Sequence, residues 1–233
     1  MRMKFSARKI LFIGLALAIQ GGCLTSIANA ANATPALEAF TTAFEKINDF
    51  TYDLRTHEAL GSDTQDRVYH YEFLKPTSAK TVITSASGAG SGFGIIGSVG
   101  VWTGGDTVVG HQGGILSMIH LKVGLHSHLT ISLRGYTIPD GLIQNVVDAY
   151  RTIAGDISQH PGGKLAGVDT DFVELKVANP TANDGVTRMD IYFSQTTHLP
   201  IRNTWYQNDQ IIRDQWFDNL KTNTGFKASD FAT

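Results

Sequence analysis

The sequence predicts a mainly β protein with two helices (α+β), built around one curved antiparallel sheet. The first observation is the last fifth of the chain, Val186–Phe231, where apolar residues such as Met189, Ile191 and Phe193 occupy alternate positions. A period of two buries one face of a strand and leaves the other face in water. The connections between these runs are short and polar, so neighbouring strands are expected to pair antiparallel. The second observation is that only two stretches, both outside this segment, have helical periodicity.

The first of these stretches begins after Thr34, a favourable N-cap residue, and has Pro35 at its first helical position. Its apolar residues form one stripe, which consists of Leu37, Phe40, Phe44 and Ile47. The second predicted helix begins near Pro139 and ends at Gly155. Its apolar face carries Leu142, Val146, Tyr150 and Ile153. Both helices need an apolar surface to cover, and the sheet is the surface available.

About ten strands are expected around these helices. The alternation and the turn residues indicate strands at 50–57, 67–74, 79–84, 100–103, 107–110, 115–123, 125–133, 164–168 and 172–178, before the closing meander. A sheet of that many antiparallel strands curls, closes or splits. If it curls, the two helices cover its concave side.

The concave side is expected to enclose a large apolar volume. Aromatic residues at alternate positions of one strand and aliphatic residues at alternate positions of another point into it: Tyr69, Tyr71, Phe73, Val173, Leu175 and Val177. Together with the stripe of the first helix, these residues predict a hydrophobic cavity under a helical lid. Such a cavity suits acyl chains.

The N-terminal segment is predicted to be a secretory signal peptide covering residues 1–30. Four basic residues precede an apolar run over 10–19, which is shorter than the roughly 20 residues that a membrane-spanning helix needs. Ala28 and Ala30 provide an A-x-A cleavage pattern. The protein is therefore expected to be exported to the periplasm.

Cys23 gives an alternative to this localisation, because a cysteine that follows an apolar run can be the lipid-modified first residue of a lipoprotein. Gln20 stands where such a signal usually has Leu, so loss of Cys23 with the signal peptide is favoured over a form anchored at Cys23. Residues 31–233 contain no other cysteine and are expected to form a single domain without a disulfide.

The charge balance argues against nucleic acid as a partner. All four basic residues of the signal segment are lost on cleavage, which leaves 15 Lys and Arg against 21 Asp and Glu. Nucleic-acid binding depends on neutralising phosphates, and this chain has no basic run to do so. No tract for a polybasic contact with anionic lipid is present either.

Five segments resemble, in order, the LolA and LolB-like superfamily of periplasmic lipoprotein carriers and its outer-membrane lipoprotein-sorting-like relatives. They are Phe44–Thr51, Tyr71–Pro76, Val101–Thr107, Thr197–Arg202 and Phe217–Asn223. The resemblance implies a half-open barrel closed by a helical lid. It also implies a latch, because such carriers have an Arg before the proline that ties the lid to the barrel. Lys75 occupies that position here and lacks the planar fork of Arg.

Catalytic and metal-binding patterns are weak. The chain has no G-x-S-x-G motif, and no cysteine nucleophile remains after removal of the signal. His126 and His128 would lie on one side of a strand, with His111 and His120 upstream, and are weak candidates for metal ligands. Their positions also fit the wetted face of that strand. We therefore predict no metal, no cofactor and no enzymatic activity.

The sequence thus favours a periplasmic binding or carrier protein that holds a lipid, a lipoprotein acyl chain or another hydrophobic ligand. Its partners would be lipids or acylated polypeptides, with membrane-associated periplasmic proteins as further partners. The alternative of another class is a non-catalytic interaction module that has a filled barrel and binds proteins through an exposed edge strand. A metal-dependent enzyme based on the histidines is the less favoured third hypothesis.

Overall fold

The computed structural model describes residues 32–89 and 95–232. Residues Ala31–Thr233 form one compact unit. The predictions of the signal peptide and of an anchor at Cys23 concern residues outside the described part of the chain. Within that part, no helix has both the length and the apolar character that crossing a bilayer requires.

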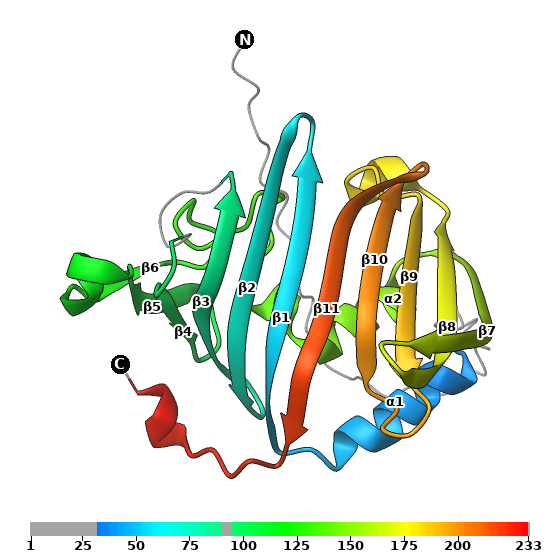
Figure 1. Cartoon of the computed structure of the whole chain (residues 1–233), viewed down its shortest axis with the longest axis horizontal. Helices are drawn as coiled ribbons and strands as arrows, with labels where there is room; N and C mark the ends of the chain where they lie inside the picture. The colour runs from blue at the N-terminus through cyan, green and yellow to red at the C-terminus, as the bar shows by residue number, and fades with distance from the viewer. Residues whose placement is uncertain (1–31, 90–94, 233) are drawn as a thin grey trace, which may run out of the picture. The chain divides into compact units, whose positions relative to one another are not determined.

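One open antiparallel sheet of 11 strands dominates the unit (Figure 1). Its strands are β1 (Asp49–Leu60), β2 (Asp63–Leu74), β3 (Ser78–Gly88), β4 (Val99–Trp102), β5 (Thr107–His111), β6 (Leu121–Gly124), β7 (Gly155–Leu165), β8 (Val168–Val177), β9 (Arg188–Ser194), β10 (Pro200–Gln207) and β11 (Gln210–Thr222). Their order in the sheet is β6-β5-β4-β3-β2-β1-β11-β10-β9-β8-β7. The chain therefore forms two meanders, β1–β6 and β7–β11, which meet along the β1–β11 pair.

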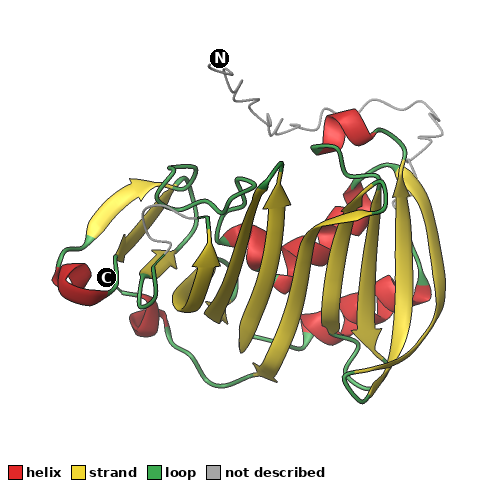
Figure 2. Cartoon of the chain, turned by 45° about the horizontal axis from the view of Figure 1, so that its top comes forward, coloured by secondary structure: helices red, strands yellow, loops and turns green. Residues whose placement is uncertain are grey.

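Two α-helices, α1 (Pro35–Glu45) and α2 (Ile143–Thr152), lie on the concave side of the sheet (Figure 2). The side chain of Thr34 accepts a hydrogen bond from the amide of Leu37 and Pro35 follows it, so α1 begins as the sequence predicted. The open curved sheet with helices on its concave side confirms the predicted fold class and the architecture that the LolA-like resemblance implied.

The space under the helices is filled by the protein's own aromatic side chains. Phe50 lies 4.8 Å from Phe73 and 6.0 Å from Phe44, measured between ring centroids. Tyr52 stacks on Tyr71 at 5.1 Å and is fully buried. The interior beneath α1 and α2 is thus a packed core, and the described residues, 32–89 and 95–232, leave no large open volume there of the kind expected from the sequence.

Three local predictions were wrong. Residues 115–123 were expected to form a strand but form the 3₁₀ helix η1 (Gly114–Met118) and then β6, because glycines precede and follow them. Residues 125–133 contain turns and bends instead of a strand. The strand β7 was missed except at its end, since Pro161 and the two glycines that follow are typical of a turn. Pro161 is compatible with β7 because β7 is an edge strand.

The second helix also differs in detail. The expected single helix after Pro139 is a 3₁₀ turn, η2 (Pro139–Gly141), followed by α2. The break at Leu142, which has an extended backbone, allows the carbonyl of Gly141 to accept a hydrogen bond from the hydroxyl of Tyr52 at 2.7 Å. The start of this segment is therefore tied directly to β1. The other short 3₁₀ helices, among them η3 (Pro180–Asn183) and η4 (Ala228–Phe231), lie in connections and near the end of the chain.

Candidate functional site: a two-pocket trough on the concave face

Along β2, β1 and β11, the residues that face the concave side change from apolar at one end to polar at the other. In register across β2, β1 and β11, Phe73 faces Phe50 and Tyr71 faces Tyr52, and these rows lie at one end. At the other end, the buried inward residues are polar: Thr56, Glu58, Gln65, Arg67, Arg213 and Gln215. We call this group the polar end. The strands therefore bury charge at one end of the face where period-two patterning alone would place hydrophobic residues.

Residues 125–138, here called the covering segment, pack over the polar end and over β2–β5. The amide of Leu133 donates to the side chain of Gln65 at 3.2 Å, and the amide of Arg134 donates to Glu58 at 3.0 Å. The hydroxyl of Tyr71 donates to the carbonyl of Ile138 at 3.2 Å. These three hydrogen bonds explain why an irregular segment lies on the sheet. Each of them satisfies a buried polar group.

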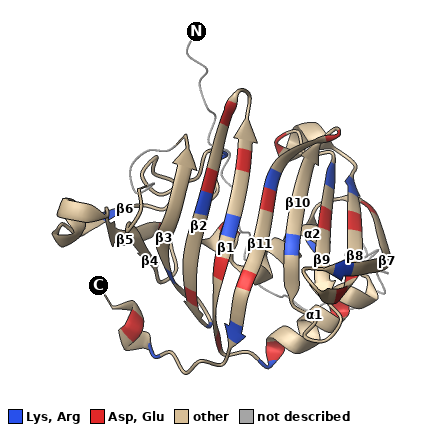
Figure 3. Ribbon diagram, viewed as in Figure 1, with Lys and Arg blue, Asp and Glu red and all other residues tan. Residues whose placement is uncertain are grey.

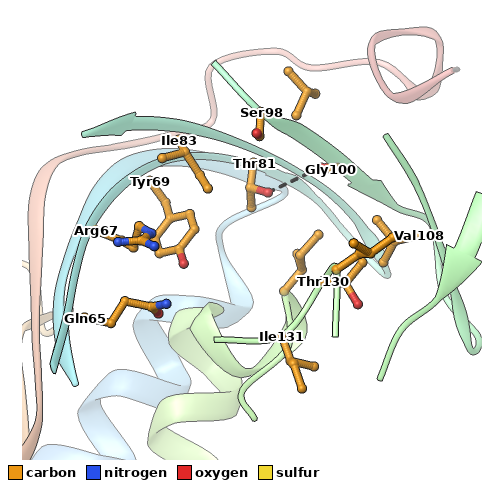
Figure 4. Close-up of a pocket in the computed structure, with 13 residues that line it drawn as sticks. Gln65, Arg67, Tyr69, Thr81, Ile83, Ser98, Gly100, Val108, Thr130 and Ile131 are labelled. Atoms are coloured by element: carbon orange, nitrogen blue, oxygen red, sulfur yellow. Dashed lines mark hydrogen bonds between the residues drawn. The ribbon is translucent and has the colours of Figure 1, made fainter. Parts of the chain in front are cut away.

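Two adjoining pockets remain between the covering segment and the sheet, and together we call them the trough. Figure 4 shows the first of the two. Their volumes are about 50 and 40 Å³. The residues shared by both pockets are Tyr69, Thr81, Thr130 and Ile138. The first pocket continues between β2–β5 and the covering segment, where Ile83, Val108, Leu129 and Ile131 form apolar walls. In this conformation the trough is far smaller than the roughly 300–1,000 Å³ of typical small-molecule sites.

Arg67 lies at one end of the first pocket, beside Gln65 and Tyr69 (Figure 4). Its side chain donates to the carbonyl oxygens of Asp66, Ser87 and Ala89 at 2.6–2.9 Å. Arg67 is only 3% exposed, and its buried Nε has no hydrogen-bond partner. Within residues 32–89 and 95–232, no carboxylate oxygen lies within 4 Å of it.

Arg213 is the second buried cation and lines the second pocket. It forms an ion pair with Glu58 at 3.9 Å, and its guanidinium lies over the ring of Tyr136 at 3.6 Å. Burial raises the pKa of Tyr69 and of Tyr71 well above the ordinary value, so both tyrosines stay neutral. Arg213 therefore differs from Arg67, because the carboxylate of Glu58 compensates the charge of Arg213.

The residues predicted to form a hydrophobic cavity divide into three groups. Only Tyr69 and Tyr71 line the trough. Phe44 is half-buried against the core. The remaining residues are buried in the core: Leu37, Phe40, Ile47, Phe73, Val173, Leu175 and Val177.

Lys75 joins the end of β2 to the last turn of α1. Its Nζ donates to the carbonyl of Phe44 at 2.6 Å and lies 4.0 Å from the centroid of the Phe44 ring. Burial lowers the pKa of Lys75, while Glu45 opposes this shift. A second contact that holds α1 comes from Arg151 of α2, which donates to the carbonyl of Leu37 at 2.7 Å.

The histidines do not assemble a metal site in the described part of the chain. There, no group of three His, Cys, Asp or Glu side chains has an arrangement that could hold a metal ion. His126 and His128 lie exposed on turns, so the strand face on which they were placed does not exist. His111 and His120 do approach each other, with ring centroids 5.2 Å apart.

Sequence reasoning missed the polar end and the trough. A signal was present, because Glu58, Arg67 and Arg213 continue the inward parity of Leu54, Tyr69 and their neighbours. A charged residue at an inward position of a strand is rare unless it has a specific partner or role. The covering segment could not be anticipated, since it was interpreted as a strand.

Two surface features lie outside the trough. Five exposed side chains form an apolar tip around η1, beside the edge strand β6, in a part of the sheet that carries few charges (Figure 3): Ile115, Leu116, Met118, Ile119 and Leu121. On the convex face, an open hollow of about 290 Å³ is lined by polar and charged residues of β1, β2 and β11 and by Trp216. Its charged, solvent-facing walls are unsuited to an apolar ligand.

Comparison with solved structures supports the fold. An uncharacterized conserved protein from Thermus thermophilus aligns with 84% of this chain over 90% of its own length, with 9% identity and a TM-score of 0.50. What the two chains share is the fold. Lipoprotein LppX from Mycobacterium tuberculosis aligns with 84% of this chain over 99% of its own length, at 12% identity and a TM-score of 0.46. A LolA superfamily protein from Nitrosomonas europaea aligns with 86% of this chain over 99% of its own, at 11% identity and a TM-score of 0.40. No family model matches the sequence, and no curated protein matches it.

Proposed function

We propose that this chain is an exported, non-catalytic binding or carrier protein that holds the hydrocarbon part of a lipid or of an acylated polypeptide. The ligand enters the trough, between the concave face of the sheet and the covering segment. The observation that carries this proposal is the trough itself, two adjoining pockets under an irregular segment, the first of which has apolar walls formed by Ile83, Val108, Leu129 and Ile131. The signal-like N-terminal sequence over residues 1–30 supports export.

Because the trough is small, the covering segment must move to admit a ligand. This segment and the helical lid α1 are the two covers of the concave face. The covering segment is held by hydrogen bonds of Leu133, Arg134 and Ile138 to the strands, and α1 is held by Lys75 at the Phe44 carbonyl. Each such bond contributes about 1 kcal/mol net. A ten-carbon chain contributes about 0.8 kcal/mol for each buried methylene, or about 8 kcal/mol. Ligand burial is therefore large enough to offset the opening of either cover.

In this proposal Lys75 acts as the latch of the helical lid. The latch in LolA-like carriers is an Arg, and Lys75 makes a single hydrogen bond where a guanidinium can make two. The lid is accordingly held more weakly than by a bidentate latch.

Native mass spectrometry of protein recovered from a bacterial periplasm tests the function. The wild-type protein should carry bound lipid. Ile131→Trp, which fills the first pocket from the covering segment, should lose that lipid while remaining folded. Val68→Trp is the matched control, because Val68 lies on β2 but faces the convex hollow, and it should keep the lipid. A lipid-free wild type that also fails to bind 1-decanol in solution would contradict the proposal and favour a filled interaction module.

A further inference from the structure

Arg67 is the least compensated charge in the trough. It is 97% buried, and in the described ranges it meets only carbonyl oxygens, whereas Arg213 has Glu58 beside it. Carbonyl dipoles satisfy two of the guanidinium nitrogens but do not neutralise the charge. A buried cation without a counter-ion costs several kcal/mol, and such a cost is recovered when an anion arrives.

The carboxylates of the polar end and of η2 are already engaged. Glu58 pairs with Arg213 and accepts the amide of Arg134. Asp140 accepts the amide and the hydroxyl of Thr137 at 2.7 and 2.6 Å. Neither is free to serve as the missing partner of Arg67.

Among the further polar groups of this pocket, Ser98 has capacity to bind a ligand. Ser98, which is 2% exposed, accepts a hydrogen bond from the amide of Gly113 at 3.3 Å, and its hydroxyl proton can be donated to a ligand. The rest of the lining, from Ile83 to Ile138, is mainly apolar (Figure 4). The site thus combines donors at buried positions with hydrocarbon walls.

We propose that the ligand is an anionic amphiphile whose head group binds the free Nε of Arg67 and whose hydrocarbon part lies along Tyr69, Ile83 and Ile138. The inference rests on the proposed function and adds the charge of the ligand to it. A carboxylate and a phosphate monoester share the required chemistry, because each presents negatively charged oxygens to a guanidinium. A neutral lipid of equal length fills the walls but leaves Arg67 uncompensated.

Calorimetric titration with four ten-carbon probes tests the inference on the wild-type protein. Decanoate and decyl phosphate should bind at least about tenfold more tightly than 1-decanol, since a hydrogen bond to a charged group contributes about 1.5–3 kcal/mol. Decylammonium should bind most weakly. A preference between the two anions identifies the head group. Equal affinity for all four probes would overturn the inference and leave the proposed function intact, whereas binding of none would contradict the proposed function.

Substitutions locate the anion. Arg67→Met should abolish the preference for decanoate over 1-decanol. Arg55→Met, on the exposed convex side of β1, is the control for a general loss of positive charge and should keep the preference. Since Arg67 also binds three carbonyl groups, Ser98→Ala serves as a second variant if Arg67→Met fails to fold, and it should weaken decanoate binding several-fold. An unchanged preference in Arg67→Met, or an unchanged decanoate affinity in Ser98→Ala, would overturn the anion site.

Discussion

The two ends of the concave face are built from the same strands but are covered in different ways. At the apolar end, aromatic rows of β1 and β2 pack against regular helices, and Phe50, Tyr52 and Phe73 are at most 1% exposed. At the polar end, Glu58, Arg67 and Arg213 lie under an irregular segment that leaves the trough. Both ends bury their inward side chains, but only the polar end leaves pockets, so buried side chains alone do not indicate a binding site. The apolar end is closed by packing, while the polar end is closed by hydrogen bonds of the covering segment.

A pair of substitutions, one in α2 and one in the covering segment, should compare the packing of the two ends directly. The substitution in α2 should give the largest change in stability. Ile143→Ala removes a fully buried side chain of α2 and should lower the free energy of unfolding by about 3 kcal/mol. Ile131→Ala removes a half-buried side chain from the covering segment and should cost about 1 kcal/mol. Urea denaturation of both variants gives the two values. Equal losses would show that the two ends are equally tightly packed and would remove the contrast between them.

The pH dependence of stability should have a separate source in the half of the sheet formed by β7–β11. Burial, with a contribution from Glu174, raises the pKa of Asp190 on β9 to about 6, although Arg188 opposes the shift. Since the unfolded value is near 3.9, the folded state binds the proton more tightly, and stability should fall as the pH rises from about 4 to 6. Asp190→Asn should remove this fall and be more stable at pH 7 by about 2 kcal/mol. Asp169→Asn, at an exposed position of β8, should leave the pH profile unchanged.

A more modest change is expected at the latch. Lys75→Met keeps the aliphatic stem but removes the hydrogen bond to the Phe44 carbonyl, which should cost about 1 kcal/mol. Hydrogen exchange should then accelerate in α1 and stay unchanged in the covering segment. Lys75→Arg should restore slow exchange. Faster exchange in both covers would mean that they open together, so that the two ends of the face are not independent.

The sequence predicted the closing meander and α1 because patterning there is strong and uninterrupted. Thr34 and Pro35 mark the start of α1, and Met189, Ile191 and Phe193 give β9 one buried face. Prediction failed where glycine and proline outweigh patterning, as in β7 with Pro161. An edge strand tolerates proline, but edge position is a property of the sheet and is not visible in a local window.

The candidate site was only partly predictable for a related reason. Tyr69 and Tyr71 were expected to face the interior, and they line the trough. Arg67 continues their parity but was not included, because apolar residues were sought at inward positions. The role inferred for Arg67 depends on its having no carboxylate partner among the described residues. That property becomes visible only once the strands are arranged in the sheet.

The joining of the two meanders along β1 and β11 determines how the domain responds to force. Phe50 near the start of β1 pairs with Thr222 at the end of β11, so the chain enters β1 and leaves β11 at the same end of this antiparallel ladder. A pulling force on the two ends of the chain would therefore peel this ladder apart one rung at a time instead of shearing all rungs together. The domain should yield at low force in a single-molecule stretching experiment, with the seam between the meanders breaking first.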